Sequence, residues 1–280
     1  MLAVIANGGH ASKACSGCRM QRVRFETVDH TAYITLNRPE ARNAFDPQMI
    51  LELTEVFRNL SREKKLRCVV LEGEGKSFCS GADLQWMQSM AAYTLEENRN
   101  DAHALDEMFA TIRACNLPII GRVQGHVMGG ALGLVAVCDI VSAEAETQFC
   151  FSEVKLGLLP AVISPYVLEK ANRGHAQRFM ITGETFTTAQ AGAMGLIHHV
   201  GTEAESKSFV VKMVAVLHLN GPESMQATKE LLKGVGTSGV SVESSELTTE
   251  AIAQRRVSEE GQEGLKSFFA KKDASWKVKL

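Results

Sequence analysis

Residues 123–160 constrain this chain more than any other stretch of it. A β-rich segment leads there to the pair Gly129 and Gly130, and residues 131–137, which are small and apolar throughout, follow directly. This order predicts a strand, a tight turn and a buried helix. The free N–H groups at the start of a helix favour an anion or a polarised carbonyl. A glycine pair also suits a turn whose sole role is to let a helix pack closely, so both interpretations stand at this point.

The size and charge of the chain exclude several classes of protein. Its 280 residues suffice for one large domain or two small ones, and 45% hydrophobic with 22% charged residues is the composition of a globular protein. The formal net charge of -2 offers no basic surface to a nucleic acid. No apolar run reaches the length that spans a membrane. We therefore expect neither nucleic acid nor a membrane as a partner.

The seven cysteines indicate a compartment rather than a site. Their number is odd and five of them stand in apolar contexts, which predicts reduced, mostly buried thiols and a cytoplasmic location. Cys15 and Cys18 form a CxxC pair, but without a second pair or a nearby histidine cluster they are weak evidence for zinc or redox chemistry. His198 and His199 are adjacent, and adjacent strand residues point to opposite faces. We expect no metal site.

Residues 1–19 differ from the rest of the chain because they lack a periodic pattern. They have neither the basic start nor the long apolar core of a signal peptide. We expect a flexible extension that is dispensable for folding. The regular pattern begins just after it, where residues 23–36 alternate and predict a β-hairpin around Asp29 and His30.

Apolar spacing and capping residues predict the helices that follow. Asp46 suits the N-cap of a helix that extends to residue 61, Thr94 opens a capping box for a helix to residue 114, and Ser164 is expected to cap a helix to residue 170. A buried strand is predicted over residues 68–72. Helices are further expected over residues 174–180, 187–194, 209–219, 222–232 and 241–272, with a strand over residues 196–200. The alternation predicts a layered α/β domain whose ligand site lies in turns at strand ends.

Five segments spread along the chain match one known family. They are LNRPEARNAF (36–45), KSFCSGADL (76–84), VQGHVMGGALGLVAVCDI (123–140), FSEVKLGLLP (151–160) and EGLKSFFAKK (263–272). With these segments in this order and spacing, the chain resembles the crotonase (enoyl-CoA hydratase/isomerase) superfamily over roughly residues 20–277. LQWMQSM (84–90) and ISPYVLEK (163–170) look most like the bacterial branch of methylglutaconyl-CoA hydratases.

The resemblance implies an architecture and a ligand. The implied fold is α/β, a crotonase-like spiral of ββα units over residues 20–200 with a C-terminal helical trimerisation region over residues 201–280. The implied assembly is a homotrimer or a hexamer that is a dimer of trimers. The implied ligand is an acyl-CoA thioester, and because the CoA is part of the substrate, no separate cofactor is expected.

The resemblance also implies a site for the thioester oxygen between two backbone N–H groups, which fall on Ala82 and Gly130. Negative charge develops on that oxygen when the thioester is converted to an enolate, and each preorganised donor typically stabilises it by about 3 kcal/mol. Gly129 is expected to let the substrate approach the backbone. The resemblance thus favours the functional interpretation of the glycine pair.

Hydratases of the family use two glutamates, and the second of them falls on Glu153. The apolar residues Phe151, Val154 and Leu156 around it favour a desolvated carboxyl group that can act as acid or base. The first family glutamate falls on Gly133, which has no side chain to hold water. Either Glu153 acts alone with an ordered water, or the reaction needs one base only, as isomerisation does.

Three other titratable residues, Asp83, Glu97 and His126, are candidates for a second proton-transfer group, although each suits a structural role better. Residues 161–163, Ala-Val-Ile, stand where most relatives have a glycine run, and they are expected to reshape the acyl pocket.

The substrate and CoA contacts that the resemblance implies are Arg42, Ala44, Asp83, Leu84, Gln85, Gly129, Gly133 and Lys271. Lys271 and its neighbour Lys272 either approach the CoA phosphates from a C-terminal helix or are solvated helix charges.

Three functions remain open on the sequence. The first is an enoyl-CoA hydratase-like lyase for a short, branched or carboxylated 2-enoyl-CoA of the methylglutaconyl type. The second is a Δ3-Δ2 enoyl-CoA isomerase that uses Glu153 to shuttle a proton. The third is a non-catalytic acyl-CoA-binding protein, which the missing carboxylate at Gly133 permits.

Overall fold

The strands of the chain form two sheets. A computed structural model describes residues 20–60, 63, 65–235 and 240–278. The larger sheet has the order β1-β2-β3-β4-β6-β9, and the smaller sheet has the order β5-β7-β8. β1 runs antiparallel to β2, and each later neighbour pair of the larger sheet is parallel. The strands are β1 Val23–Val28, β2 Thr31–Leu36, β3 Cys68–Gly73, β4 Ile119–Val123, β5 His126–Met128, β6 Ile140–Glu144, β7 Gln148–Cys150, β8 Phe186–Thr187 and β9 His199–Gly201.

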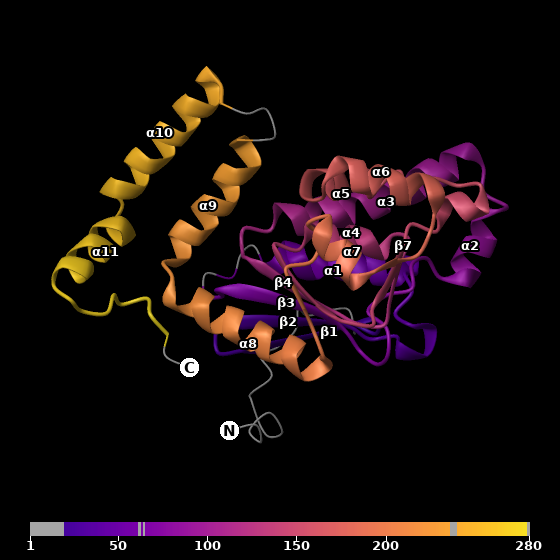
Figure 1. Ribbon diagram of the computed structural model, residues 1–280, viewed down its shortest axis with the longest axis horizontal. Helices are drawn as coiled ribbons and strands as arrows, with labels where there is room; N and C mark the ends of the chain where they lie inside the picture. The colour runs from indigo at the N-terminus through magenta and orange to yellow at the C-terminus, as the bar shows by residue number, and fades with distance from the viewer. Residues whose placement is uncertain (1–19, 61–62, 64, 236–239, 279–280) are drawn as a thin grey trace.

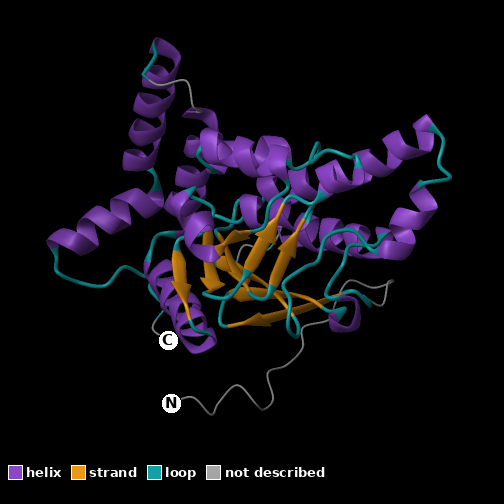
Figure 2. Cartoon of the chain, turned by 45° about the vertical axis from the view of Figure 1, so that its right-hand side comes forward, coloured by secondary structure: helices purple, strands orange, loops and turns teal. Residues whose placement is uncertain are grey.

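Successive chain segments alternate between the two sheets. β4 lies in the larger sheet and β5 in the smaller one, and helix α4 (Ala131–Val137) follows; β6 and β7 repeat the step. An isolated bridge between Cys79 and Val127 brings the segment after β3 alongside β5 in the same way. Helices surround the strands in Figure 2. The predicted α/β spiral of ββα units is confirmed.

The helices begin where the sequence places capping side chains. The Met49 N–H donates to the Asp46 carboxylate at 2.8 Å, and Thr94 with Glu97 forms the expected capping box. The helices are α1 Pro47–Leu60, α2 Leu84–Met90, α3 Leu95–Ala114, α4, α5 Ser164–Lys170, α6 Arg173–Thr182, α7 Thr188–Ala193, α8 Glu203–Leu219, α9 Pro222–Val235, α10 Val242–Val257 and α11 Glu259–Phe269. Two 3-10 helices, η1 Pro39–Ala41 and η2 Glu153–Leu156, complete the described set.

A large apolar core holds the spiral together, and a second, smaller cluster lies where α8 packs on β3 and β4. Helices α1 and α3 pack on each other, and α3 and α5 both contact α4, whose residues are all buried. The burial of a whole helix explains its composition, since any polar side chain there would need a partner inside the protein. Helix α4 is therefore fixed from all sides, and its first turn has a fixed place.

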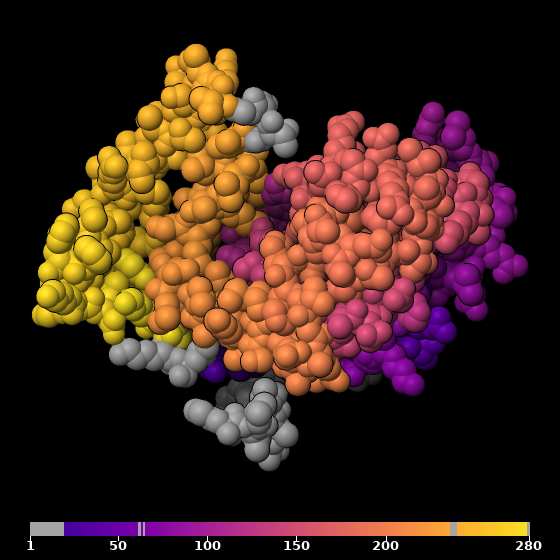
Figure 3. Space-filling model, viewed as in Figure 1, coloured from indigo at the N-terminus to yellow at the C-terminus, as the bar shows by residue number. Residues whose placement is uncertain are grey.

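Helices α9, α10 and α11, which we call the C-terminal arm, lie at the left of Figure 1 and of Figure 3. α9 packs on the rest of the chain through the buried Lys229, which pairs with Asp139, whereas α10 and α11 contact α9 and each other. Neither α10 nor α11 has a buried residue, and the arm exposes large apolar side chains such as Ile252, Val257, Phe268 and Phe269.

The structure corrects three expectations of secondary structure. Ser164 is the first residue of α5 and Ile163 occupies the cap position, where no side chain bonds the helix. The single helix expected over residues 241–272 is two helices, because Ser258 is extended and caps α11 through the Gly261 N–H. The strand expected over residues 196–200 lies at His199–Gly201, so His198 precedes it.

The predictions for residues 1–19, including the Cys15 and Cys18 pair, concern a segment outside the described residues. Within the described ranges, no helix combines the length and the apolar character needed to cross a membrane.

Candidate active site

Two turns of the chain meet at the predicted oxyanion site. The Cys79 N–H donates to the His126 carbonyl, and the Met128 N–H donates to the Cys79 carbonyl, both at 3.2 Å. These bonds set the two segments side by side in parallel, so that the turn after Gly81 faces the turn at Gly129. A Cβ added to Gly81 would lie 2.8 Å from the Met128 carbonyl oxygen. The turns are therefore in contact, and Gly81 permits that contact.

The backbone around the two turns leaves two amides free. The Phe45 N–H donates to the Gly81 carbonyl and the Phe45 carbonyl accepts from the Asp83 N–H, both at 2.7 Å. These bonds hold the residues on either side of Ala82. Within the described part of the chain, neither the Ala82 N–H nor the Gly130 N–H has a hydrogen-bond acceptor. Two free amides in touching turns suit an oxygen on which negative charge develops.

Glu153 faces these turns from the start of η2. A Cβ added to Gly129 would lie 3.3 Å from Glu153 Oε1, and the positive φ of Gly129, 53°, favours glycine in any case. Glu153 Oε2 is buried and bonds no described residue. Burial raises the pKa of the Glu153 carboxyl group above its usual range. The prediction that Leu156 contributes to this burial is wrong, because the Leu156 side chain is exposed.

Gly133 lies within α4, and side chains from neighbouring elements fill the space that a side chain at this position would occupy. A Cβ at Gly133 would lie 2.6 Å both from Phe109 Cζ on α3 and from Ile163 Cγ2 before α5. Phe109 and Ile163 are buried, and the Phe109 ring also contacts Phe45 edge-on and Tyr166. The space that a glutamate side chain would need is thus filled with hydrocarbon.

The three candidates for a second proton-transfer group are all engaged elsewhere. Asp83 caps α2 through the Gln85 and Trp86 amides and pairs with Arg38 at 3.0 Å, which lowers the pKa of the Asp83 carboxyl group. Glu97 is exposed and belongs to the α3 capping box, where its bonds to Thr94 lower its pKa. His126 is exposed and shares a hydrogen bond with Ser77. Their arrangement supports a structural role for each.

The implied CoA contacts divide into two groups. The Ser80 N–H donates to the Arg42 carbonyl at 3.0 Å, so the turn that carries Arg42 and Ala44 lies beside the Ala82 segment, and Leu84 and Gln85 are exposed in the first turn of α2. Lys271 follows α11, which lies at the opposite end of the molecule from α2 in Figure 1. One chain therefore does not bring Lys271 to the other implied contacts.

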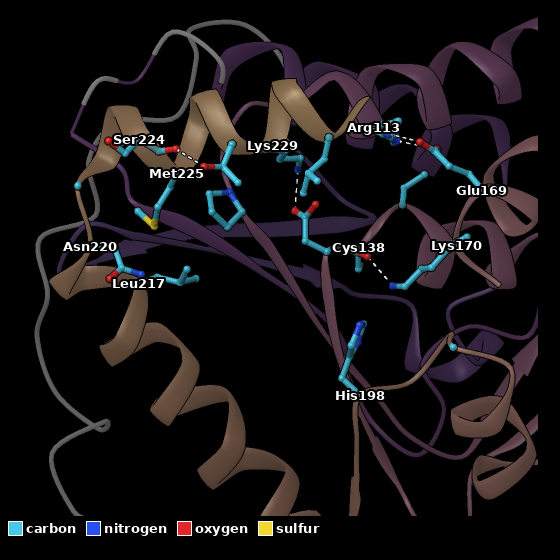
Figure 4. A pocket seen from close by; sticks show the side chains of 18 residues that line it. Arg113, Cys138, Glu169, Lys170, His198, Leu217, Asn220, Ser224, Met225 and Lys229 are labelled. Carbon is cyan, nitrogen blue, oxygen red and sulfur yellow. Dashed lines mark hydrogen bonds and ion pairs between the residues drawn. The ribbon is translucent and has the colours of Figure 1, made fainter. Parts of the chain in front are cut away.

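A pocket of about 780 Å³ lies away from these turns, between the end of α4, the end of α5 and α9 (Figure 4). Its lining does not include Glu153, Ala82 or Gly130. In the described ranges, no group of three His, Cys, Asp or Glu side chains is arranged to hold a metal ion.

Sequence reasoning missed two residues that shape this region. Phe109 fills the space opposite Gly133, and the signal for it was a glycine in the middle of an otherwise buried helix. Lys170 bonds carbonyl groups at the end of α4, and the signal for it was a lysine in the last turn of α5.

Comparison with known proteins shows the family to which the chain is similar and the fold that it shares. The family model described as enoyl-CoA hydratase/isomerase matches residues 26–279. A solved enoyl-CoA hydratase from Shewanella pealeana is 36% identical with a TM-score of 0.89, covering 92% of this chain and 97% of that chain. AtuE from Pseudomonas aeruginosa is 29% identical with a TM-score of 0.88, covering 92% of this chain and 100% of that chain. The 2,3-dehydroadipyl-CoA hydratase of Escherichia coli is 26% identical over 253 residues, covering 87% of this chain and 94% of that protein.

Proposed function

The chain belongs to the enoyl-CoA hydratase/isomerase family, the crotonase superfamily, and from this premise we propose that it hydrates a short 2-enoyl-CoA with Glu153 as its one proton-transfer carboxylate. The observation that carries the proposal is the buried Oε2 of Glu153, which has no partner among the described residues and lies beside the glycine turn. A buried carboxylate oxygen without a partner is costly unless a ligand or water completes it.

One carboxylate is sufficient for this addition. The Ala82 and Gly130 amides hold the thioester oxygen and thereby make the β-carbon of the conjugated acyl group electrophilic. Glu153 takes a proton from a water molecule as the water oxygen bonds to the β-carbon. The α-carbon of the resulting enolate then takes that proton from Glu153. Water has been added in full, and the carboxylate is regenerated.

The isomerase alternative is favoured by one specific observation. Phe109 and Ile163 fill the space next to Gly133, so among the described residues no carboxylate stands at that position to orient water. An isomerase needs no water: Glu153 removes a proton from the α-carbon of a 3-enoyl-CoA and returns it to the γ-carbon. The same two amides stabilise the intermediate enolate.

A branched or carboxylated acyl group is the substrate class we propose within the family. The motif ISPYVLEK, which resembles methylglutaconyl-CoA hydratases, includes Ile163, and this residue packs against the Gly133 position. Two relatives carry names of the same kind, the 2,3-dehydroadipyl-CoA hydratase of Escherichia coli and a mevalonyl-coenzyme A hydratase of Aspergillus fumigatus. These similarities support the class, and the acyl pocket formed with residues 161–163 would select within it.

The proposed assembly is a homotrimer or a hexamer built from two trimers. The exposed apolar side chains of the C-terminal arm, among them Phe268 and Phe269, support a contact with a second copy. In such an assembly Lys271 would reach a CoA bound to the neighbouring subunit. Light scattering of the purified protein, compared with a Phe268→Ser, Phe269→Ser variant, tests this, and a wild-type monomer would contradict it.

Product analysis by mass spectrometry tests the activity. The protein is incubated with crotonyl-CoA, 3-methylcrotonyl-CoA, 3-methylglutaconyl-CoA and a 3-enoyl-CoA. A product heavier by one water, formed fastest from the branched or carboxylated esters, is the expected result. Conversion of the 3-enoyl ester to the 2-enoyl ester without a change in mass would identify an isomerase. Binding of the esters without turnover of any of them would identify a binding protein.

A further inference from the structure

The pocket of about 780 Å³ between α4, α5 and α9 contains two lysines in different states. Figure 4 shows Lys170 pointing to the Cys138 backbone and Lys229 approaching from α9. Lys229 Nζ pairs with Asp139 Oδ2 at 2.6 Å and donates to the Leu117 carbonyl at 3.0 Å. The ammonium group of Lys229 is therefore held by a carboxylate.

Lys170 lacks such a carboxylate. Its Nζ donates to the carbonyl oxygens of Cys138 at 2.6 Å and Val135 at 3.1 Å, and no ion pair to a described acidic residue is formed. Burial lowers the pKa of the Lys170 ammonium to about 8, with smaller opposing contributions from Cys138 and Asp139. A sizeable fraction of Lys170 is thus a neutral amine near physiological pH, and a neutral amine is a nucleophile.

We propose that Lys170 is a site of Nε-acylation by acyl-CoA thioesters, and that its acylation lowers turnover at Glu153. The Lys170 nitrogen attacks the thioester carbonyl carbon, a C–N bond forms and the C–S bond breaks. CoA leaves as the thiol, and it carries the proton that the amine gives up. The products are an amide at Lys170 and free CoA, so the reaction needs no other reagent. The pocket volume is in the range that accommodates the acyl end of such a ligand.

The link to the catalytic turns is α4 itself. Lys170 bonds the carbonyl groups at the end of this helix, where a cation is favourable, and Gly130 lies at its other end. A helix of 7 residues is only about 10 Å long. Acylation removes the charge and leaves one N–H donor for two carbonyl groups. The expected consequence is a less firmly placed Gly130 amide and a lower kcat.

The first experiment maps acylation. Wild-type protein and Glu153→Gln are incubated with acetyl-CoA, which has no double bond to hydrate, and each lysine is quantified by peptide mass spectrometry. At pH 7.5 we expect Lys170 to react at least about tenfold faster than Lys229, which shares the pocket, and than the exposed Lys212. The Lys170 rate should level off above pH 8, whereas ordinary exposed lysines gain reactivity through about pH 10.

The second experiment follows turnover and acyl-CoA affinity during the incubation. The kcat of the wild type should fall in proportion to the acylated fraction of Lys170. Lys170→Arg keeps a cation but cannot be acylated under these conditions, so it should lose no activity relative to its own starting value. Equal reactivity of Lys170 and Lys212, or selective acylation of Lys170 with an unchanged kcat, would overturn the proposal. Because the mapping needs no turnover and works equally in Glu153→Gln, it is independent of whether the chain is a hydratase.

Discussion

The two ends of helix α4 are built in opposite ways. At the first turn, the Gly130 amide and the Glu153 Oε2 atom bond no described residue. At the last turn, the Leu134 carbonyl accepts from Cys138 Sγ at 3.1 Å, and Lys170 Nζ donates to the carbonyl groups of Val135 and Cys138. Each polar group left unbonded inside a protein costs about 1–3 kcal/mol. We propose that a ligand completes the groups at the first end, whereas the Leu134, Val135 and Cys138 carbonyls at the other end are bonded by side chains of the protein.

The middle of α4 is apolar and joins these two ends rigidly. Every residue from Ala131 to Val137 is buried, so the helix cannot shift without disturbing the core. Its fixed position presents the Gly130 amide to the neighbouring Ala82 turn. We therefore propose that the last turn and the buried middle of α4 contribute stability, and that the first turn serves the reaction. The variants below test this division.

Glu153→Gln should have the largest effect. The substitution keeps the shape and polarity of the side chain but removes the base, so turnover should fall by about two to four orders of magnitude while the acyl-CoA still binds. Steady-state kinetics with the best ester of the panel and calorimetric binding measure the two quantities. Glu97→Gln is the matched control, since it removes a carboxylate from the exposed capping box of α3, and it should turn over near the wild-type rate. Wild-type turnover in Glu153→Gln would refute the one-carboxylate site.

Gly130→Val should have the next largest effect. A Cβ at Gly130 meets the Phe45 ring at an ordinary 3.5 Å, and the backbone there is helical, so the fold should tolerate the side chain. The added isopropyl group stands where the thioester must approach the amide, and turnover should fall by about two to three orders of magnitude, comparable to loss of one oxyanion donor. Gly130→Ala should give a smaller loss. Full activity in folded Gly130→Val would remove Gly130 from the oxyanion site.

The proposed functional end of α4 was easier to recognise in the sequence than the opposite end. The Gly129 and Gly130 pair and the carboxylate at Glu153 can be recognised in the sequence, because a glycine pair marks a turn and a charged residue is rare in a buried segment. The hairpin, the caps at Asp46 and Thr94 and the alternation of strand and helix were also predictable, since each depends on residues close in sequence. The contacts of Phe109 and Ile163 with Gly133 were not, because they join three separate elements.

The break at Ser258 was missed for a related reason. A serine is tolerated in a helix interior although it favours an N-cap, and the apolar spacing continues on both sides of Ser258. The exposed position of Leu156 was missed because an apolar residue next to a buried one need not be buried itself. Residues close in sequence thus determine whether a segment is a helix, a strand or a turn, and tertiary packing determines which segments face each other.

Gly133→Ala should destabilise the middle of α4. An alanine in a helix is normally about 1 kcal/mol better than glycine, but here its Cβ would lie 2.6 Å from Phe109 Cζ and from Ile163 Cγ2. Overpacking of this kind costs about 1–3 kcal/mol of unfolding free energy. Urea denaturation measures it, and Gly192→Ala in α7, where the nearest atom is 3.8 Å away, should not destabilise. Equal stability of the two variants would show that the space beside Gly133 is not filled.

The same contact predicts the outcome of restoring the family's first glutamate. Gly133→Glu should lower stability further than Gly133→Ala, because a carboxylate would enter hydrocarbon without a partner. It should therefore not raise the rate of hydration. Phe109→Leu combined with Gly133→Ala should recover part of the alanine loss, since it removes the Cζ atom, and a double-mutant cycle measures that coupling. Additive losses would mean that Phe109 and Gly133 do not interact.

The smallest effect is a gain of stability in Glu153→Gln. Burial raises the folded-state pKa of the Glu153 carboxyl group above its unfolded value, so the folded protein binds this proton more tightly than the unfolded chain does. The charged carboxylate therefore costs stability above the folded pKa, and the cost disappears as the pH falls below the unfolded value of about 4.3. At pH 8 Glu153→Gln should be more stable than the wild type by on the order of 1 kcal/mol, as is common when a functional group is removed from its site. Urea denaturation of both proteins between pH 4 and pH 8 should show this difference shrinking toward the acid end. A difference that stays constant with pH, or that grows as the pH falls, would mean that the carboxylate is stabilised by its surroundings and is not the incomplete group at the functional end of α4.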